Sequence, residues 1–253
     1  MSTAVTPPVD GTPPLSQIER VIDTFVAPSK TFADINRSAN FILPWLLMLI
    51  VSIAYSATVG AKIGWDHVYQ TQQRFSPASQ QQRMDSLPPE QKANAVRLGI
   101  NITKFIAYGF QVGWLIYLAI VALILWAVFS FGLGSEITFL KSWAIVVFAS
   151  LPGIIKILLA TGVLAAGKMD PDLFMIQNPI GTNAGYFMPF ADTPRFLYSL
   201  GTSVDLFAIW TMALTAIGFS VVGKVKTGTA MAVIFGLWGL VVLAGAAIAG
   251  AFA

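Results

Sequence analysis

Residues 105–131 read FIAYGFQVGWLIYLAIVALILWAVFSF and contain no Asp, Glu, Lys or Arg. A helix needs roughly 20 apolar residues to cross the hydrocarbon core of a bilayer, which is about 30 Å thick. This stretch therefore predicts a membrane-spanning helix. Four further apolar segments qualify by length, and they cover residues 41–63, 139–166, 204–222 and 229–251. We predict an all-α, polytopic membrane protein whose core is a five-helix transmembrane bundle.

The composition of the whole chain supports a membrane protein and excludes several kinds of chemistry. Of its 253 residues, 56% are hydrophobic and 11% are charged, whereas soluble domains carry about 25% charged residues. The chain has no Cys and a single His, His67, so disulfides, thiolate metal sites and multi-histidine sites are excluded. The net charge of +3 is small and the basic residues are scattered, which argues against nucleic-acid binding. We predict no catalytic residues, no cofactor and no metal ligands.

The region before the first span divides into a tail and a helical segment. We predict a flexible tail over 1–14, cytoplasmic amphipathic helices over 15–40, and the membrane domain over 41–253, with polar loops at 65–104 and 167–201. Ser16 and Glu19 have the spacing of a capping box, which starts a helix. Its apolar face would hold Leu15, Ile18, Val21, Ile22, Phe25 and Val26, opposite Glu19, Arg20 and Asp23. Such a helix lies on the membrane surface or packs under the bundle.

The orientation of the bundle rests on its basic residues. The tight turn Lys224-Val225-Lys226 between the last two spans is a positive-inside signal, and it places the N-terminus in the cytoplasm. A count over all the segments outside the spans mildly opposes this orientation. Most of the opposing charges lie in the single segment 65–104, where Asp66, Asp85 and Glu90 balance them.

One charged residue, Lys156, lies well inside a span. An ionisable group at that depth costs about 3 kcal/mol, and it is a candidate functional residue for that reason. It follows Pro152 and Gly153, which break the third span and can open a polar cavity there. The alternative is a lysine that extends to the headgroups from an off-centre helix.

Asp205, at the start of the fourth span, is the natural partner of Lys156. We place Lys156 roughly 15 Å deep and Asp205 only a few ångströms deep, because a helix rises about 1.5 Å per residue. A direct ion pair between them would need a tilted helix or a bridging water. The rival interpretation, which we favour, is that Asp205 or Ser203 caps the fourth span.

Small residues recur at helical spacing in several spans. The pairs Gly60-x-x-x-Gly64 and Gly109-x-x-x-Gly113 are joined by the glycines of the fifth span, Gly236, Gly239, Gly245 and Gly250. Small residues let helices approach closely in a membrane. We expect them to pack helices within the chain, and a homo-oligomer or partner face is the alternative. Asp170-Pro171-Asp172 is interpreted as a turn rather than a pair of metal ligands.

Two stretches of the sequence resemble those of a known family. The first is Val26-Ala-Pro28-Ser-Lys-Thr31-Phe32-Ala-Asp-Ile35, with Pro44 at the head of the first span; the second is Asp205-Leu206-Phe207-Ala-Ile-Trp210, leading to Leu214 and Gly218. With five spans, they resemble the bacterial branch of the Yip-domain family of Ypt/Rab-interacting membrane proteins. The resemblance covers about residues 18–250. It implies five helices, a cytoplasmic N-terminus, a bacterial inner membrane and no enzymatic activity.

Two functions are compatible with these features. The first is a non-enzymatic scaffold that organises the membrane or binds other membrane proteins, with the lipid bilayer itself as a partner. The second is a small transporter, or an accessory subunit of a transport complex, with a polar path near Lys156. A water-lined cavity that reaches Lys156 would favour transport.

Overall fold

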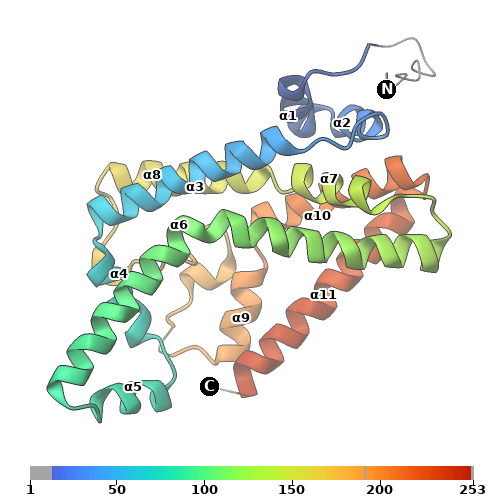
Figure 1. Ribbon diagram of the computed structural model, residues 1–253. Coiled ribbons are helices and arrows are strands. Elements are labelled where there is room, and N and C mark those ends of the chain that lie inside the picture. The colour runs from blue at the N-terminus through green and yellow to red at the C-terminus, as the bar shows by residue number, and fades with distance from the viewer. Residues whose placement is uncertain (1–12, 191, 252–253) are drawn as a thin grey trace. The chain divides into compact units, whose positions relative to one another are not determined.

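The computed structural model describes residues 13–190 and 192–251, and they form helices joined by short connections (Figure 1). In chain order the helices are α1 (Gln17–Val26), α2 (Pro28–Ile35), α3 (Ile42–Lys62), α4 (Trp65–Arg74), α5 (Ala78–Asp85), α6 (Pro89–Ala127), the π-helix η1 (Val128–Gly132), α7 (Phe139–Ala149), α8 (Pro152–Ala165), the 3₁₀ turns η2 (Pro171–Leu173) and η3 (Ala184–Phe187), α9 (Arg195–Ser203), α10 (Leu206–Gly223) and α11 (Thr227–Ala251). Within these ranges the extended structure is one isolated bridge between Asn183 and Asp205. The all-α prediction is confirmed.

Five helical segments are long and apolar enough to cross a membrane, as the sequence predicted. They are Ile42–Lys62, Pro89–Gly132, Phe139–Ala165, Leu206–Gly223 and Thr227–Ala251. Their ends differ from the predicted ends by only a few residues, except at the start of the second. The third span is divided into α7, which ends at Ala149, and α8, which begins at Pro152. The predicted tail, 1–14, lies outside the described residues except for 13 and 14.

The segment 65–104, predicted as a polar loop with one helix-forming stretch over 90–98, is mostly helical in the structure. It contains α4, α5 and the first turns of α6, which continues without a break into the second span. The reason is that no helix-breaking residue follows Pro89 until Gly99, and a helix that has begun propagates at little cost. Gly99 is used for a close approach, because a Cβ there would overlap the ring of Tyr69.

The contacts divide the described residues into two compact units, each with its own core. The first unit comprises 13–46, 116–151 and 211–234, and the second comprises 47–115, 152–190, 192–210 and 235–251. In the second unit a cluster of seven buried residues joins α3, α4 and α8 to the segment after α8: Tyr55, Val59, Val68, Ala160, Leu164, Phe174 and Ile180. This cluster holds the segment 167–201, the predicted second loop, against α8.

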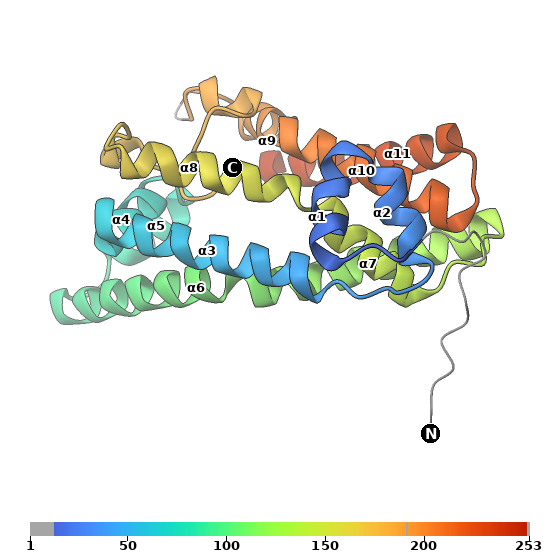
Figure 2. The same cartoon turned by 90° about the horizontal axis from the view of Figure 1, so that it is seen from above.

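In the first unit, α1 and α2 lie side by side and pack against α7 (Figures 1 and 2). The predicted capping box is present, since the Ser16 hydroxyl accepts from the Glu19 N–H at 3.2 Å and a Glu19 carboxylate oxygen accepts from the Ser16 N–H at 2.7 Å. Phe32 and Ile35 of α2 are fully buried. A Cβ on Gly218 of α10 would meet both Phe32 and Ile145 of α7, so the two stretches that carry the family resemblance meet at this point.

Replacing Gly218 with alanine is expected to destabilise the first unit by about 1–3 kcal/mol, because the added methyl group overlaps Ile145 and lies 3.0 Å from the Phe32 ring. Thermal unfolding of the purified protein in detergent measures the effect. Gly236→Ala is the matched control, since nothing lies within 4 Å of a Cβ at Gly236. Equal unfolding temperatures for Gly218→Ala and the unmodified protein would contradict this close packing of α2, α7 and α10.

Candidate functional site: a paired lysine and aspartate

Lys156 lies near the beginning of α8, directly after the break in the third span. Pro152 has no N–H to donate, and the Phe148 carbonyl accepts from the Leu151 N–H at 3.1 Å instead. The preceding turn is closed by Ser150, whose hydroxyl donates to the Val147 carbonyl at 2.7 Å. Nothing lies within 4 Å of a Cβ at Gly153. Pro152 therefore determines where α8 begins, and Lys156 follows one turn later.

The Lys156 ammonium binds Asp205 directly. Its Nζ donates to Asp205 Oδ2 at 2.8 Å, with 24% of the Lys156 side chain and 7% of the Asp205 side chain exposed. Asp205 also caps α10, because its Oδ1 accepts from the N–H groups of Phe207 at 2.9 Å and Ala208 at 3.2 Å. The favoured capping role and the direct ion pair are both present, one on each carboxylate oxygen.

The two side chains meet directly, although we expected Lys156 to lie roughly 15 Å deep and Asp205 only a few ångströms deep. Lys156 is nine residues before Ala165, the last residue of α8, which corresponds to about 14 Å along the helix. Asp205 can reach Lys156 because the segment after α8 returns along that helix before α10 begins. The Leu206 N–H donates to the Thr182 carbonyl at 3.0 Å, which holds this returning segment at the start of α10.

Three further polar residues, which no pattern in the sequence indicated, complete the site. The Thr182 hydroxyl donates to Asp205 Oδ2, and Asn183 Nδ2 lies 3.5 Å from the same oxygen. Asn183 Nδ2 also donates to Asn178 Oδ1 at 2.7 Å, and both asparagines are buried. Their only sequence signal is that they are polar residues without charge in an aromatic, proline-rich segment.

The remaining family-motif residues lie at or near the starts of helices, and they differ in burial. Pro28 is the first residue of α2, Pro44 lies buried in the first turn of α3, and Phe207 is buried at the start of α10. Leu206 is 63% exposed, and Trp210 is partly buried. These residues lie on three different helices and do not form a common site.

His67 takes part in a second, exposed ionic cluster. Asp172 Oδ1 lies 2.9 Å from His67 Nε2 and 3.4 Å from Arg74 Nη2, and these contacts join α4 to η2. Asp170 accepts from the Asp172 N–H at 2.9 Å, so Asp170-Pro171-Asp172 forms the predicted turn. Among the described residues, no group of three or more His, Asp or Glu side chains is placed to hold a metal ion.

Acidification is expected to loosen the contact between α4 and η2. The hydrogen bonds from His67 and then from Arg74 hold the pKa of Asp172 below its ordinary value. A carboxylate with a lowered pKa stabilises the fold above its ordinary pKa of about 3.9, and this contribution is lost as the pH falls through the lower folded-state value. The protection of the α4 amides, measured as their exchange rate relative to the intrinsic rate at each pH, should therefore fall below about pH 4, and Asp172→Asn should remove this component of the fall. An unchanged pH profile in Asp172→Asn would contradict the assignment.

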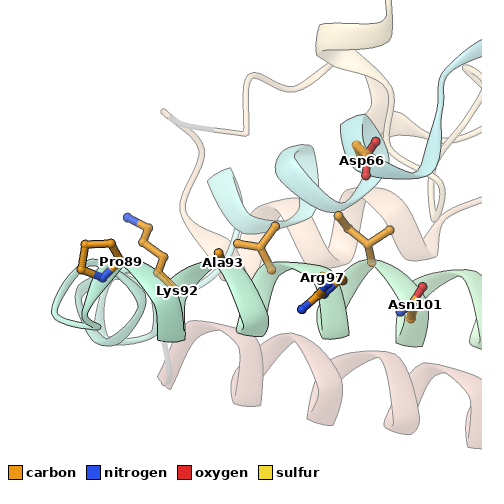
Figure 3. Close-up of a pocket in the computed structure, with 8 residues that line it drawn as sticks. Asp66, Pro89, Lys92, Ala93, Arg97 and Asn101 are labelled. Atoms are coloured by element: carbon orange, nitrogen blue, oxygen red, sulfur yellow. The ribbon is translucent and has the colours of Figure 1, made fainter.

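An open groove lies on the polar side of α6, apart from the lysine–aspartate site. It is lined by Asp66 from α4 and by the early residues of α6, including Lys92 and Arg97 (Figure 3). Lys92 already pairs with Asp85 at 2.7 Å. None of the residues singled out from the sequence as candidate functional residues lines this groove.

A family model described as the Yip1 domain matches residues 22–249. The match includes both stretches that carry the resemblance and all five spans. No curated protein and no solved structure matches the chain.

Proposed function

Since the chain belongs to the Yip1 domain family of multi-pass membrane proteins, we propose that it is a non-enzymatic scaffold that binds other membrane proteins, including copies of itself. We place it in a bacterial inner membrane with its N-terminus in the cytoplasm. The positive-inside turn Lys224-Val225-Lys226 and the family resemblance support this orientation.

The observation that carries the proposal is an open space on the outer face of α6, at Gly109 and Gly113, which we call the notch. Nothing lies within 4 Å of a Cβ at Gly109 or Gly113, so these glycines do not serve the packing within the chain that we expected. Because an α-helix turns by about 100° per residue, both glycines lie on the same face of α6 as a row of exposed apolar side chains. These are Ile102, Phe105, Ile106, Ile116, Tyr117, Ile120 and Ile124. Paired small residues on an outward face let a second helix approach closely.

The fifth span supports the same function. In the apolar 18-residue stretch of each span, only 11% of the residues are buried in α11 and 22% in the span that contains α6. The corresponding share is 56% in the third span. Gly236, Gly239 and Gly245 on α11 also have open space at their Cβ positions. Two of the five spans therefore expose most of their surface to lipid or to lateral partners.

Affinity purification from native membranes, after cross-linking, tests the proposal. The unmodified chain should recover a second copy or a reproducible membrane partner, and Gly113→Ile should reduce that recovery several-fold by filling the notch. Gly162→Ile is the matched control, because it adds the same side chain at an open position on α8. Recovery of no partner would contradict the scaffold, and equal recovery with Gly113→Ile would contradict the assigned face.

Transport is the second candidate function, and the ion pair between Lys156 and Asp205 favours it, because paired charges among spans often mark ion pathways. Flux across proteoliposomes that contain the chain tests this function. A flux abolished by Lys156→Leu at unchanged protein level would support transport over the scaffold. A flux that Lys156→Leu leaves unchanged would contradict it.

A further inference from the structure

The helix α1 is turned so that its apolar side faces away from the protein. Arg20 and Thr24 are buried, so it is the predicted polar face, which carries Arg20, that packs against the protein. Ile18, Ile22 and Val26 are exposed by 66%, 55% and 74%. At 100° per residue, the outward row lies directly opposite the buried pair. An unpartnered aliphatic stripe therefore runs along the outer side of α1.

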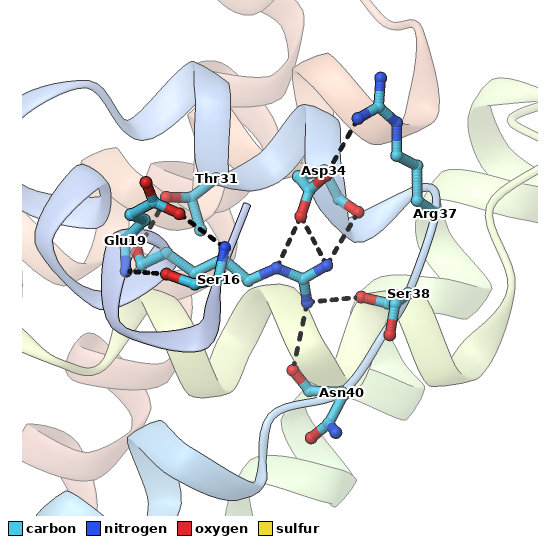
Figure 4. Close-up of polar contacts among 8 residues, drawn as sticks. Ser16, Glu19, Thr31, Asp34, Arg37, Ser38 and Asn40 are labelled. Carbon is cyan, nitrogen blue, oxygen red and sulfur yellow. Dashed lines mark hydrogen bonds and ion pairs between the residues drawn. The ribbon is translucent and has the colours of Figure 1, made fainter. Parts of the chain in front are cut away.

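A buried ionic network determines this rotation of α1 (Figure 4). Arg20 Nε donates to Asp34 Oδ2 at 2.7 Å, and Arg20 Nη1 donates to the Ser38 carbonyl at 2.8 Å. The Arg20 carbonyl accepts from the hydroxyls of Thr24 at 2.7 Å and Thr31 at 2.9 Å. The outward position of the aliphatic stripe is thus a consequence of specific contacts, since the opposite side is anchored to α2.

The pair α1–α2 packs against the sides of two spans, close to their ends. The Ser135 hydroxyl donates to the Gly223 carbonyl at 3.0 Å, so α7 begins at the level where α10 ends. Phe32 packs against Ile145 and Gly218, which lie six residues after Phe139 and five residues before Gly223. These offsets correspond to about 9 Å and about 7.5 Å along the helices. The α1–α2 pair therefore packs within the terminal turns of both spans, and an interfacial helix buries its apolar face over a similar distance of about 5–10 Å.

We propose that α1 inserts Ile18, Ile22 and Val26 into the boundary between headgroups and acyl chains, in the leaflet at which α7 begins. The first unit carries six Lys and Arg against four Asp and Glu over its described residues, and this excess suits anionic headgroups. The same end of the unit exposes Ile42 and Leu140 on spans, so the stripe continues a lipid-facing surface. This lipid contact is a further interaction surface, and it does not depend on the partner face of α6.

A fluorescent probe on α1 tests the insertion, and the absence of Cys from the chain allows single cysteines to be placed without other changes. The full chain with Ile22→Cys is labelled with an environment-sensitive dye and reconstituted into vesicles of phosphatidylcholine and phosphatidylglycerol. We expect blue-shifted emission and several-fold stronger quenching by brominated lipid than for Asp23→Cys. Asp23 lies on the flank of the same helix and serves as the matched control.

A second measurement removes the influence of the dye. The unlabelled cysteine at position 22 should react several-fold more slowly with a water-soluble maleimide than the cysteine at position 23, because a thiol in lipid does not ionise readily. Equal reaction rates, with equal quenching by iodide, would overturn the proposal. Protection of position 22 that appears only at high protein-to-lipid ratio would also overturn it, because a second copy would then cover the stripe.

Discussion

Replacing Arg20 with alanine is expected to destabilise the attachment of α1 to α2 by about 3–5 kcal/mol. Arg20 and Asp34 are 2% and 4% exposed, with 2.6 Å between Arg20 Nη2 and Asp34 Oδ2. Removing one partner of a buried pair leaves an uncompensated charge, which costs far more than the pair itself contributes. Amide hydrogen exchange over α1 and α2 measures the loss, and α1 should exchange rapidly in Arg20→Ala while the spans stay protected.

Two companion variants separate the ion pair from general damage to the fold. Arg37 also contacts Asp34, at 3.5 Å, but its side chain is 29% exposed, so Arg37→Ala should cost less than about 1 kcal/mol. The double variant Arg20→Met with Asp34→Leu removes both charges and should recover much of the protection, as apolar replacements of buried pairs often do. Protection in Arg20→Ala equal to that of the unmodified chain would contradict the role assigned to Arg20.

Removing Asp205 is expected to have the second large effect, because one carboxylate performs two tasks. In Asp205→Ala, Lys156 loses its partner and the Phe207 and Ala208 N–H groups lose their cap. We expect a loss of about 3–5 kcal/mol, of which about 1 kcal/mol is the cap. Thermal unfolding in detergent and protease resistance of the segment 167–201 measure it.

The effect of the complementary change at Lys156 should be smaller. In Lys156→Met the Asp205 carboxylate keeps its bonds from Thr182, Phe207 and Ala208, so we expect a loss of about 1–3 kcal/mol. Lys168→Met is the control, because Lys168 is an exposed lysine in the segment 167–201. This change should alter the stability of the protein little. If Lys156→Met destabilised the protein more than Asp205→Ala, Asp205 would not be the residue on which the site chiefly depends.

Local chemistry made much of the helical architecture predictable. A span is recognised by its length and hydropathy alone, which is why all five were found to within a few residues except at the start of α6. The capping box at Ser16 and Glu19 was predictable because both of its hydrogen bonds close within three residues. The break before α8 was predictable because the missing N–H of Pro152 is a property of that residue.

The site was predictable only in part. Lys156 stood out because a charge in an apolar span is costly, and Asp205 stood out as the acidic residue at the start of the fourth span. The separation of Lys156 and Asp205 along their helices argued against direct contact. The contact could not be foreseen, because the path of the segment 167–201 cannot be deduced from its composition. Thr182, Asn178 and Asn183 carried no charge and no periodic pattern, so their approach to Asp205 was not predictable.

The sequence by itself determined the spans, the family and the residues whose charge is unusual, because each follows from local composition or from short motifs. Only the tertiary structure decided which side of α1 is buried, which glycines remain open and what Lys156 binds. Apolar periodicity located the apolar side of α1 but left open whether that side faces the membrane or the bundle, since it does not include the buried bonds from Arg20 to Asp34 and the Ser38 carbonyl. Those contacts join residues 14 or more positions apart, and their geometry exists only once α1 and α2 have packed together.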